Sequence, residues 1–431
     1  MGPSRARRSL SFAAATAVAA SLAVTGCSSS GGSGDAAGGK ITLTVATFSD
    51  FGYKPLIAEY EKAHPNVTVK ERVSQLDQHH NSLSTQLSSG SGAADVVAIE
   101  EGYLPKFREV KDKFVNLADY GAAARKDEYL PYKWAQGTTA DGFVLGYGTD
   151  VGGLAICYRK DLFQQAGLPT DRAEVAKLWP TWDAYFKTGD AFRAKVADHA
   201  WFDSAGNVFS AMMNQTEVGF FDTSDSYVAD TNPKVKEFFQ SAGAAAEHGL
   251  SANLAPFSQQ WNAGIKQGKM ATMTCPAWMT GLIQSAAGPE SAGKWDIAAV
   301  PGGGGNWGGS FLTVPKQSKH AKEAAELAAF LTSAASEKAI FQGPTGSLPS
   351  LQGPLQDPAV QGTKQPYFSD APTGQIFAAS ATGLKPSFRG TKDQEVRIPF
   401  GNALQLIEQQ KATTAEAWTK ALDEAKKGLA H

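Results

Sequence analysis

Two pairs of adjacent residues could in principle carry catalysis or bind a metal. Glu100-Glu101 supplies two carboxylates, the groups that glycosidases use, but neighbours in sequence point in different directions and no partner is evident. His79-His80 supplies two imidazoles. Side chains at i and i+1 do not converge on a metal as those at i and i+4 can, so a solvated turn is the favoured interpretation. These pairs predict neither an active site nor a metal site.

Glycine-rich segments offer little for a cofactor. Residues 303–308 fit the GxGxxG pattern, but they precede a predicted strand, so a bound phosphate would lack a helix N-terminus. Residues 288–294 match the start of a phosphate loop, yet Trp295 stands where a Ser or Thr should bind magnesium. The Gly-x-Ser-x-Gly motif of hydrolases does not occur in the 431 residues. We expect a protein that is not an enzyme and needs no cofactor.

Two tryptophans in loops give a stronger signal. Trp278 follows Pro276-Ala277, and Trp307 lies among glycines and an asparagine. An indole face can stack on the apolar face of a sugar ring while carboxylates and amides bind its hydroxyls. The alternative is a core tryptophan with its N–H satisfied, which we expect for four others in helix or strand patterns: Trp182, Trp261, Trp295 and Trp418.

The first part of the chain alternates predicted strands and helices. Strands are expected at 41–48, 67–73 and 95–99, with helices at 55–63 and 81–88 between them. This rhythm indicates a parallel sheet flanked by helices, and such sheets bind ligands beyond the carboxyl ends of their strands. The residues placed there are Ser49, Asp50, Phe51, Glu100 and Glu101.

A second α/β region is predicted from about residue 148. Strands are expected at 153–158, 270–275 and 295–300, whereas 310–315 reads as a strand back in the first region. Cys157 and Cys275 fall in two of these strands. If the strands are neighbours, a disulfide would close a loop of more than a hundred residues and contribute about 4–5 kcal/mol; two buried free thiols are the alternative.

The first 26 residues have the layout of a secretory signal peptide. Three arginines precede an apolar stretch from Leu10 to Val24, which is shorter than the roughly 20 residues that span a bilayer. Val24 to Cys27 resembles the lipobox of bacterial lipoproteins, in which the cysteine receives lipid and becomes the first mature residue. An ordinary signal peptide with an incidental cysteine is the alternative, and either the general or the twin-arginine export route remains open.

Residues 27–39 are predicted to form the lipidated cysteine, carrying acyl chains such as palmitate, and a flexible linker. The Ser/Gly-rich stretch after Cys27 would reach about 20 Å, and two acyl chains suffice for stable anchoring. The formal charge of −2 becomes −5 once the three arginines of residues 1–26 are removed, which excludes the basic face of a nucleic-acid binder. The remaining length suits two large domains.

Four segments in a fixed order carry a resemblance to a known family. They are residues 158–163, 166–169, 268–273 leading to Trp278, and 328–333. With the lipobox, they make the chain similar to extracellular solute-binding lipoproteins of ABC importers, the sugar-binding family that includes maltose-binding protein. The sequence near Tyr158 and at 306–315 is most similar to that of actinobacterial proteins that bind oligosaccharides, including cello-oligosaccharides. One departure is Cys275-Pro276-Ala277, where Gly-Pro is common before the tryptophan.

The resemblance implies an α/β, two-lobed periplasmic-binding-protein fold of type II with a sugar in the cleft at the hinge. The first lobe would comprise 40–149 and 308–352, and the second lobe 150–307 and 353–431. The ligand-binding residues carried over are Asp50, Phe51, Glu100, Glu101, Thr149, Asp150, Gly152, Asn207, Asn214, Trp278, Trp307, Gly308, Ser310 and Arg397.

The function expected from the resemblance is capture of a sugar by hinge closure and its delivery to the membrane subunits of an ABC importer. The protein would act as a monomer on the outer face of the cell membrane, held by Cys27. A binder of a non-sugar solute such as a peptide or polyamine, or less readily a secreted glycoside hydrolase, are the alternatives.

Overall fold

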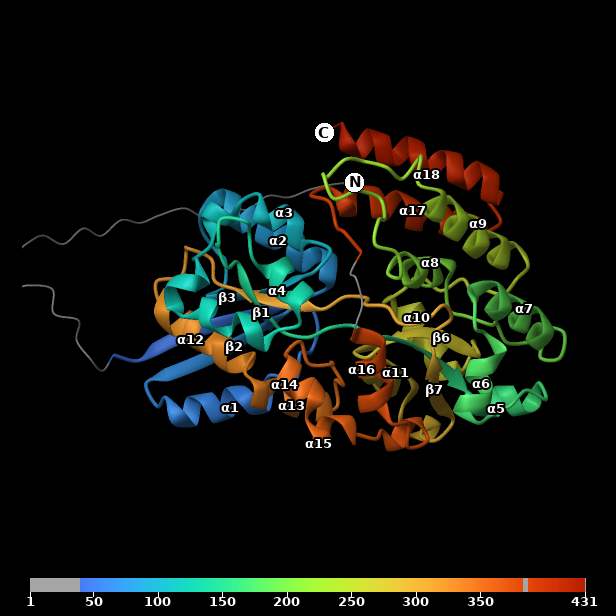
Figure 1. Ribbon diagram of the computed structural model, residues 1–431, viewed down its shortest axis with the longest axis horizontal. Coiled ribbons are helices and arrows are strands. Elements are labelled where there is room, and N and C mark those ends of the chain that lie inside the picture. Colours follow the sequence, from blue (N-terminus) through green and yellow to red (C-terminus); the bar gives the residue numbers. More distant parts are fainter. Residues whose placement is uncertain (1–38, 383–386, 431) are drawn as a thin grey trace, which may run out of the picture. The chain divides into compact units, whose positions relative to one another are not determined.

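The structure is a computed structural model that describes residues 39–382 and 387–430; the predicted signal peptide and lipobox lie outside these ranges. Its first sheet has the strand order β2-β1-β3-β8-β4 (Figure 1). The pairs β1–β2 and β1–β3 are parallel, as the sequence predicts, whereas β8 runs antiparallel to β3 and β4. The bounds are β1 (Ile41–Thr47), β2 (Val67–Val73), β3 (Val96–Glu100), β4 (Gly146–Gly148) and β8 (Ser310–Thr313).

The second sheet has three strands in the order β6-β5-β7, with β5 (Leu154–Arg159) at the centre and both pairs antiparallel. Its neighbours are β6 (Thr272–Pro276) and β7 (Trp295–Ala299). All six residues of β5 are buried, and the five from Leu154 to Tyr158 alternate between two core clusters, as the period of two requires. The sheet is therefore covered by helices on both faces.

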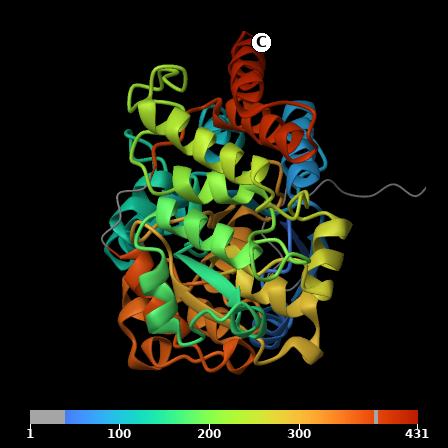
Figure 2. The same cartoon turned by 90° about the vertical axis from the view of Figure 1, so that its right-hand side faces the viewer.

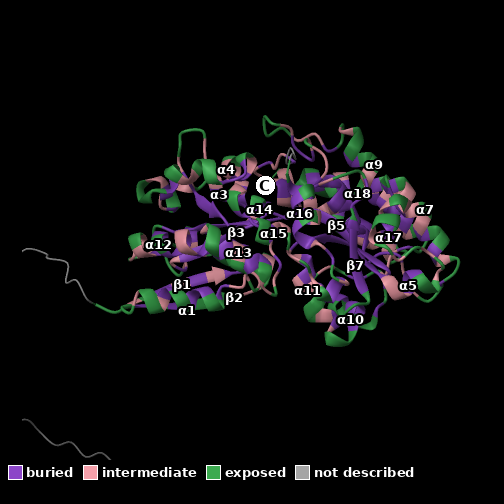
Figure 3. Cartoon of the chain, turned by 60° about the horizontal axis from the view of Figure 1, so that its bottom comes forward, coloured by how far each residue is buried: buried purple, intermediate pink, exposed green. Residues whose placement is uncertain are grey.

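Helices cover both sheets, and their outer faces are exposed (Figure 3). Those around the first sheet are α1 (Lys54–Ala63), α2 (Leu76–Ser89), α3 (Leu104–Arg108), α4 (Pro131–Gly137), α12 (Ala321–Leu331) and α13 (Ala334–Gln342). One face of the second sheet packs against α7 (Trp182–Arg193), α8 (Ala205–Met213), α9 (Pro233–Glu247), α17 (Asp393–Glu408) and α18 (Thr414–Leu429); the other packs against α10 (Gln259–Gln267), α11 (Met279–Ala287) and α16 (Thr373–Ala381). The remaining helices are α5 (Lys160–Gln165), α6 (Arg172–Leu178), α14 (Gln352–Gln356) and α15 (Pro358–Gln361). In Figure 2 the green helices of residues 160–250 lie in front of this sheet.

Three extended segments, which we call the hinge, connect the sheets and lie side by side. In the first, residues 149–153, the Thr149 N–H donates to Ser310 O at 2.9 Å and the Trp307 N–H donates to Gly152 O at 2.8 Å. Trp307 and Ser310 belong to the second segment. The third segment contains Leu348, whose carbonyl oxygen accepts the Val151 N–H. Strands β1–β4 and β8 fall inside the proposed first-lobe boundaries and β5–β7 inside those of the second. We keep that division as a proposal that this arrangement supports.

A disulfide joins Cys157 on β5 to Cys275 on β6, with the Cα atoms 5.4 Å apart and a sequence separation of 118. It lies in the core between the second sheet and the α10–α11 face. The structure therefore agrees with the disulfide interpretation of these two cysteines.

The predicted solvated turn at His79-His80 is wrong, because α2 begins at Leu76 and both imidazoles are buried. His79 Nε2 lies 2.7 Å from Ala98 O, and His80 Nδ1 lies 2.8 Å from Leu76 O. The His80 ring stacks on Tyr103 with centroids 3.9 Å apart. Each ring therefore has a backbone hydrogen-bond partner, which lets it enter the core.

Among the described helices, none is both long and apolar enough to cross a bilayer.

Candidate ligand cleft

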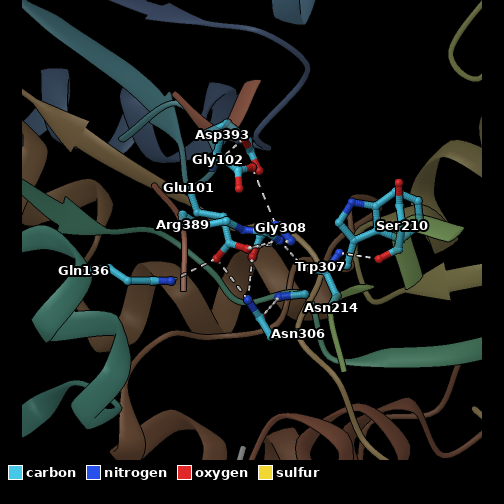
Figure 4. A network of polar contacts seen from close by, with 12 residues as sticks. Glu101, Gly102, Gln136, Ser210, Asn214, Asn306, Trp307, Gly308, Arg389 and Asp393 are labelled. Carbon is cyan, nitrogen blue, oxygen red and sulfur yellow. Dashed lines mark hydrogen bonds and ion pairs between the residues drawn. The ribbon is translucent and has the colours of Figure 1, made fainter. Parts of the chain in front are cut away.

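Glu101, which directly follows β3, forms hydrogen bonds with Asn306 and Gly308 of the second hinge segment (Figure 4). The residue is 5% exposed. Its carboxylate accepts hydrogen bonds from Asn306 Nδ2 at 3.0 Å, the Gly308 N–H at 3.3 Å and Gln136 Nε2 at 3.4 Å. Burial raises its pKa, and Arg389 and Lys133 oppose that rise. The protein thus already occupies both carboxylate oxygens.

Arg389, whose side chain is 7% exposed, is a residue of this site that the sequence interpretation missed. Its guanidinium donates to Asn214 Oδ1 at 2.5 Å, lies 3.7 Å from Asp393 and comes within 4.0 Å of Glu101 (Figure 4). Asp393 also accepts from Arg397 at 2.9 Å. Arg389, Asp393 and Arg397 are spaced i, i+4, i+8, a ladder of alternating charge that could have been recognised.

Glu100 lies beside this network, at the carboxyl end of β3. The residue is partly buried, and its Oε2 accepts the Gly102 N–H at 2.7 Å. Burial and the neighbouring Glu101 raise the pKa of Glu100 to about 7, while Arg397 and Arg389 pull it down. Glu100 and Arg397, which are both predicted to bind the ligand, are therefore close enough for their charges to interact.

Asp150, on the first hinge segment, is held by its own neighbours. Its Oδ1 accepts from Thr149 Oγ1 at 2.6 Å and from the Ser310 N–H at 3.0 Å. Burial raises the pKa of Asp150, opposed by Lys133. The Lys133 ammonium is buried 3.9 Å from the Phe311 ring centroid and has no hydrogen-bond partner among the described residues. Burial lowers its pKa, against the attraction of Asp150.

Trp278 rests against the hinge. Its Nε1–H donates to Trp307 O at 2.9 Å, and the two rings meet edge to face with centroids 5.9 Å apart. A Cβ on Gly152 would lie 1.7 Å from Trp307 O, so only glycine permits this approach. Phe257, 44% exposed and at φ +62°, places its ring centroid 6.2 Å from that of Trp278. Phe257 could not be predicted as part of the site, since its loop has no regular pattern.

The remaining predicted residues divide between the surface and the interior. Asp50 is exposed and accepts the Gly52 N–H at 2.8 Å, and Phe51 packs on Phe48 at 5.1 Å. Asn207 is 3% exposed and donates to Asp203 at 2.5 Å inside the second lobe. The structure therefore does not bring Asn207 to the hinge, because the buried carboxylate of Asp203 takes its amide.

A cavity of about 610 Å³ lies elsewhere, between the start of α4 and helices α14–α16. None of the predicted ligand-binding residues lines it. In the described ranges there is also no cluster of three metal-ligating side chains. The hinge and the strand ends around it remain the candidate site.

Comparison with known proteins assigns the family. A family model described as bacterial extracellular solute-binding protein matches residues 55–368. A solved structure of an extracellular solute-binding protein of family 1 is 45% identical, with a TM-score of 0.80, covering 90% of this chain and 99% of that one.

Relatives with named ligands are more distant. The arabinooligosaccharide-binding protein of Bacillus subtilis (strain 168) is 28% identical over 327 residues, 72% of each chain. The ABC transporter-associated binding protein from B. animalis subsp. lactis Bl-04, solved with β-1,6-galactobiose, is 25% identical with a TM-score of 0.78, covering 90% of this chain and 98% of that one. On this evidence the chain belongs to the family of bacterial extracellular solute-binding proteins.

Proposed function

We propose that this protein is a lipid-anchored receptor that captures an oligosaccharide between its two lobes and delivers it to an ABC importer. The observation that carries the proposal is the convergence at the hinge of an aromatic surface and polar groups from both sheets. Trp278 and Phe257 supply the aromatic surface. Glu100 at the end of β3 and Arg397 on α17 supply polar groups whose charges interact.

The contacts proposed for the sugar follow from which groups the protein leaves available. The Trp278 ring is partly buried, and its one polar atom is bonded to the hinge. Its face would therefore stack on a sugar ring. Asp50 is exposed and would bind hydroxyls at the outer end of the cleft. Glu101 and Asp150, whose carboxylates the hinge already uses, would shape the cleft instead of gripping the ligand.

Named ligands of similar proteins support the choice of an oligosaccharide. Arabinooligosaccharide and β-1,6-galactobiose are each named for a relative or neighbour introduced above. They favour a short saccharide over a peptide or polyamine. A cello-oligosaccharide remains a candidate on the resemblance in sequence.

Capture would work by hinge closure, since the three hinge segments are the connections between the sheets. Each lobe contributes part of the site, so the complete set of contacts exists only in the closed form. The sugar then shifts the population toward that form by its differential affinity. The membrane subunits of the importer would recognise the closed lobes, and no reaction would occur on the ligand.

The anchor belongs to the same proposal. Residues 24–27 would direct lipid to Cys27, and the linker to residue 39 would let the receptor swing about 20 Å from the membrane. Mass spectrometry of the protein purified from membranes should find a diacylglyceryl modification on Cys27. An unmodified N-terminus downstream of residue 26 would contradict the anchor.

Isothermal titration against a saccharide panel tests the proposed function. The panel should hold cello-, malto-, xylo- and arabinooligosaccharides and β-1,6-galactobiose, with tri-alanine and spermidine as non-sugar ligands. We expect saturable binding of at least one saccharide, recovered intact by chromatography. Binding of only the peptide or the polyamine would replace the sugar, and cleavage of a saccharide would replace the receptor with a hydrolase.

A further inference from the structure

Charged side chains, which we call the seam, make contact between the end of β3 and the segment 389–397 at the start of α17. Glu101 approaches Arg389 at 4.0 Å, and a Cβ on Gly102 would lie 2.6 Å from Gln394 Nε2. Further out, Lys106 pairs with Glu395 at 3.5 Å. These contacts join residues almost three hundred positions apart in sequence, so they form only where the two lobes meet.

The inner part of this seam, in which Glu100 and Arg397 are partly buried, carries more acids than bases. Glu100, Glu101 and Asp393 face the guanidinium groups of Arg389 and Arg397. The side chains of Glu101, Arg389 and Asp393 are 4%, 7% and 1% exposed. Lys133 is paired electrostatically with Asp150 and adds no net charge. Three carboxylates against two guanidiniums leave one negative charge uncompensated, which is costly where water is excluded.

The surroundings of Glu100 identify where that charge can be neutralised. Glu101 is its repelling neighbour, Arg389 and Arg397 attract it from across the seam, and Lys133 acts from α4. On the side of α2 and α3, the Tyr103 hydroxyl donates to Asp77, and the His80 ring accepts the Glu100 N–H. That ring is neutral, because burial lowers the pKa of His80 to about 3. Neither of these neighbours therefore supplies a positive charge, and Lys106 of α3 is paired with Glu395.

We propose that closure of the lobes takes up one proton, held on the Glu100 carboxyl group, so that capture of the ligand is favoured in mildly acidic surroundings. This rests on the proposed function and concerns the regulation of the same cleft. In the open form water solvates Glu100 and the carboxylate is ionised. On closure one proton from the solvent converts the carboxylate to a carboxylic acid, and the seam becomes neutral.

The raised pKa of Glu100, about 7, is consistent with this step. With an ordinary carboxyl pKa in the open form, closure should take up protons between about pH 5 and pH 7. Ligand affinity should then be about tenfold higher at pH 6 than at pH 8, since the proton is bound more tightly in the closed form.

Titration calorimetry in two buffers tests the proton. The binding enthalpy of the best saccharide of the panel is measured at pH 7 in phosphate and in Tris, whose ionisation enthalpies differ. We expect a difference that corresponds to uptake of a fraction of one proton, absent in Glu100→Gln and retained in Glu395→Gln, the control at the exposed edge of the seam. A buffer-independent enthalpy for the unsubstituted protein, or uptake unchanged in Glu100→Gln, would overturn the proposal.

A measurement without sugar tests proton uptake by Glu100 independently of the proposed function. If no saccharide binds, the receptor function fails, and small-angle X-ray scattering from the sugar-free protein and from Glu100→Gln at pH 5 and pH 8 tests the proton uptake. Because the closed form binds the proton more tightly, acid shifts the sugar-free protein toward the closed form. The radius of gyration of the unsubstituted protein should therefore be smaller at pH 5 than at pH 8, and this difference should be lost in Glu100→Gln. The same pH dependence in both proteins, or none in the unsubstituted protein, would refute the buried proton.

Discussion

At the scale of single residues, the indole ring of Trp278 is hydrogen-bonded at its N–H edge and only partly buried. The Trp307 carbonyl fixes the indole N–H, which orients the ring at little cost. Trp278→Ala should weaken saccharide binding by tenfold or more while the thermal unfolding midpoint changes little, because the ring is only partly buried. Calorimetry measures the affinity, and Trp418→Phe on α18 is the control. Unchanged affinity would remove Trp278 from the site.

Gly152 is required by the approach of two hinge segments. Gly152→Ala would drive a Cβ into Trp307 O, so the segments must separate and the bond from Trp278 must be lost. We expect weaker ligand binding and a lower unfolding midpoint. Gly401→Ala on α17 is a matched control: a Cβ there meets nothing within 4 Å, and alanine stabilises a helix interior by roughly 0.5–1 kcal/mol. Equal effects of the two substitutions would contradict the packing at Gly152.

His80 should make stability sensitive to acid. Its folded pKa, lowered to about 3 by burial, lies below the ordinary value, so the unfolded chain binds more protons and stability falls as the pH falls below about 6.5. This contribution amounts to about 2 kcal/mol between pH 7 and pH 5. Urea unfolding at the two pH values should show a smaller acid loss in His80→Gln, which keeps a polar side chain but cannot titrate. An identical pH dependence in both proteins would contradict the neutral buried ring.

At the scale of elements, the disulfide should stabilise the second lobe by closing a long loop. The 118-residue separation of Cys157 and Cys275 corresponds to about 5 kcal/mol at most in the chain-entropy model. The double substitution to alanine should lower the free energy of unfolding by several kcal/mol, with reductant affecting only the unsubstituted protein. Reductant that leaves the unsubstituted protein unchanged would contradict the bond.

The elements were more predictable than the contacts among them. Strands such as β1 and β2 were evident because β-branched residues alternate along them, and the parallel order followed from the helices between them. The start of α2 was missed because two histidines read as polar, although backbone carbonyls allow them to be buried. The antiparallel second sheet was not foreseen, since a strand pattern does not determine the direction of its partner.

The site was partly predictable for a related reason. Loop tryptophans and strand-end carboxylates were recognisable from residue type and position. Arg389 was not, because its partners Glu101 and Asn214 are brought to it only by the meeting of two lobes. Nor could the sequence distinguish Asn207, whose amide serves Asp203 in the interior, from an amide that faces the cleft.

At the scale of the whole molecule, the hinge connects two sheets, and core clusters pack against each of them. The cluster that contains the disulfide also includes Leu130, Phe341 and Leu348, which fall inside the proposed first-lobe boundaries. Rotation about the hinge must therefore carry these three side chains with the second sheet or move them against it. The charged seam is then a consequence of closure, whereas the aromatic surface belongs to the second lobe alone.

Small-angle X-ray scattering with and without the best-bound saccharide tests capture by closure most directly. The account predicts that the radius of gyration decreases on addition of saturating saccharide, toward the value calculated from the described residues of this structure. A radius of gyration that does not change while the saccharide binds would contradict capture by hinge closure.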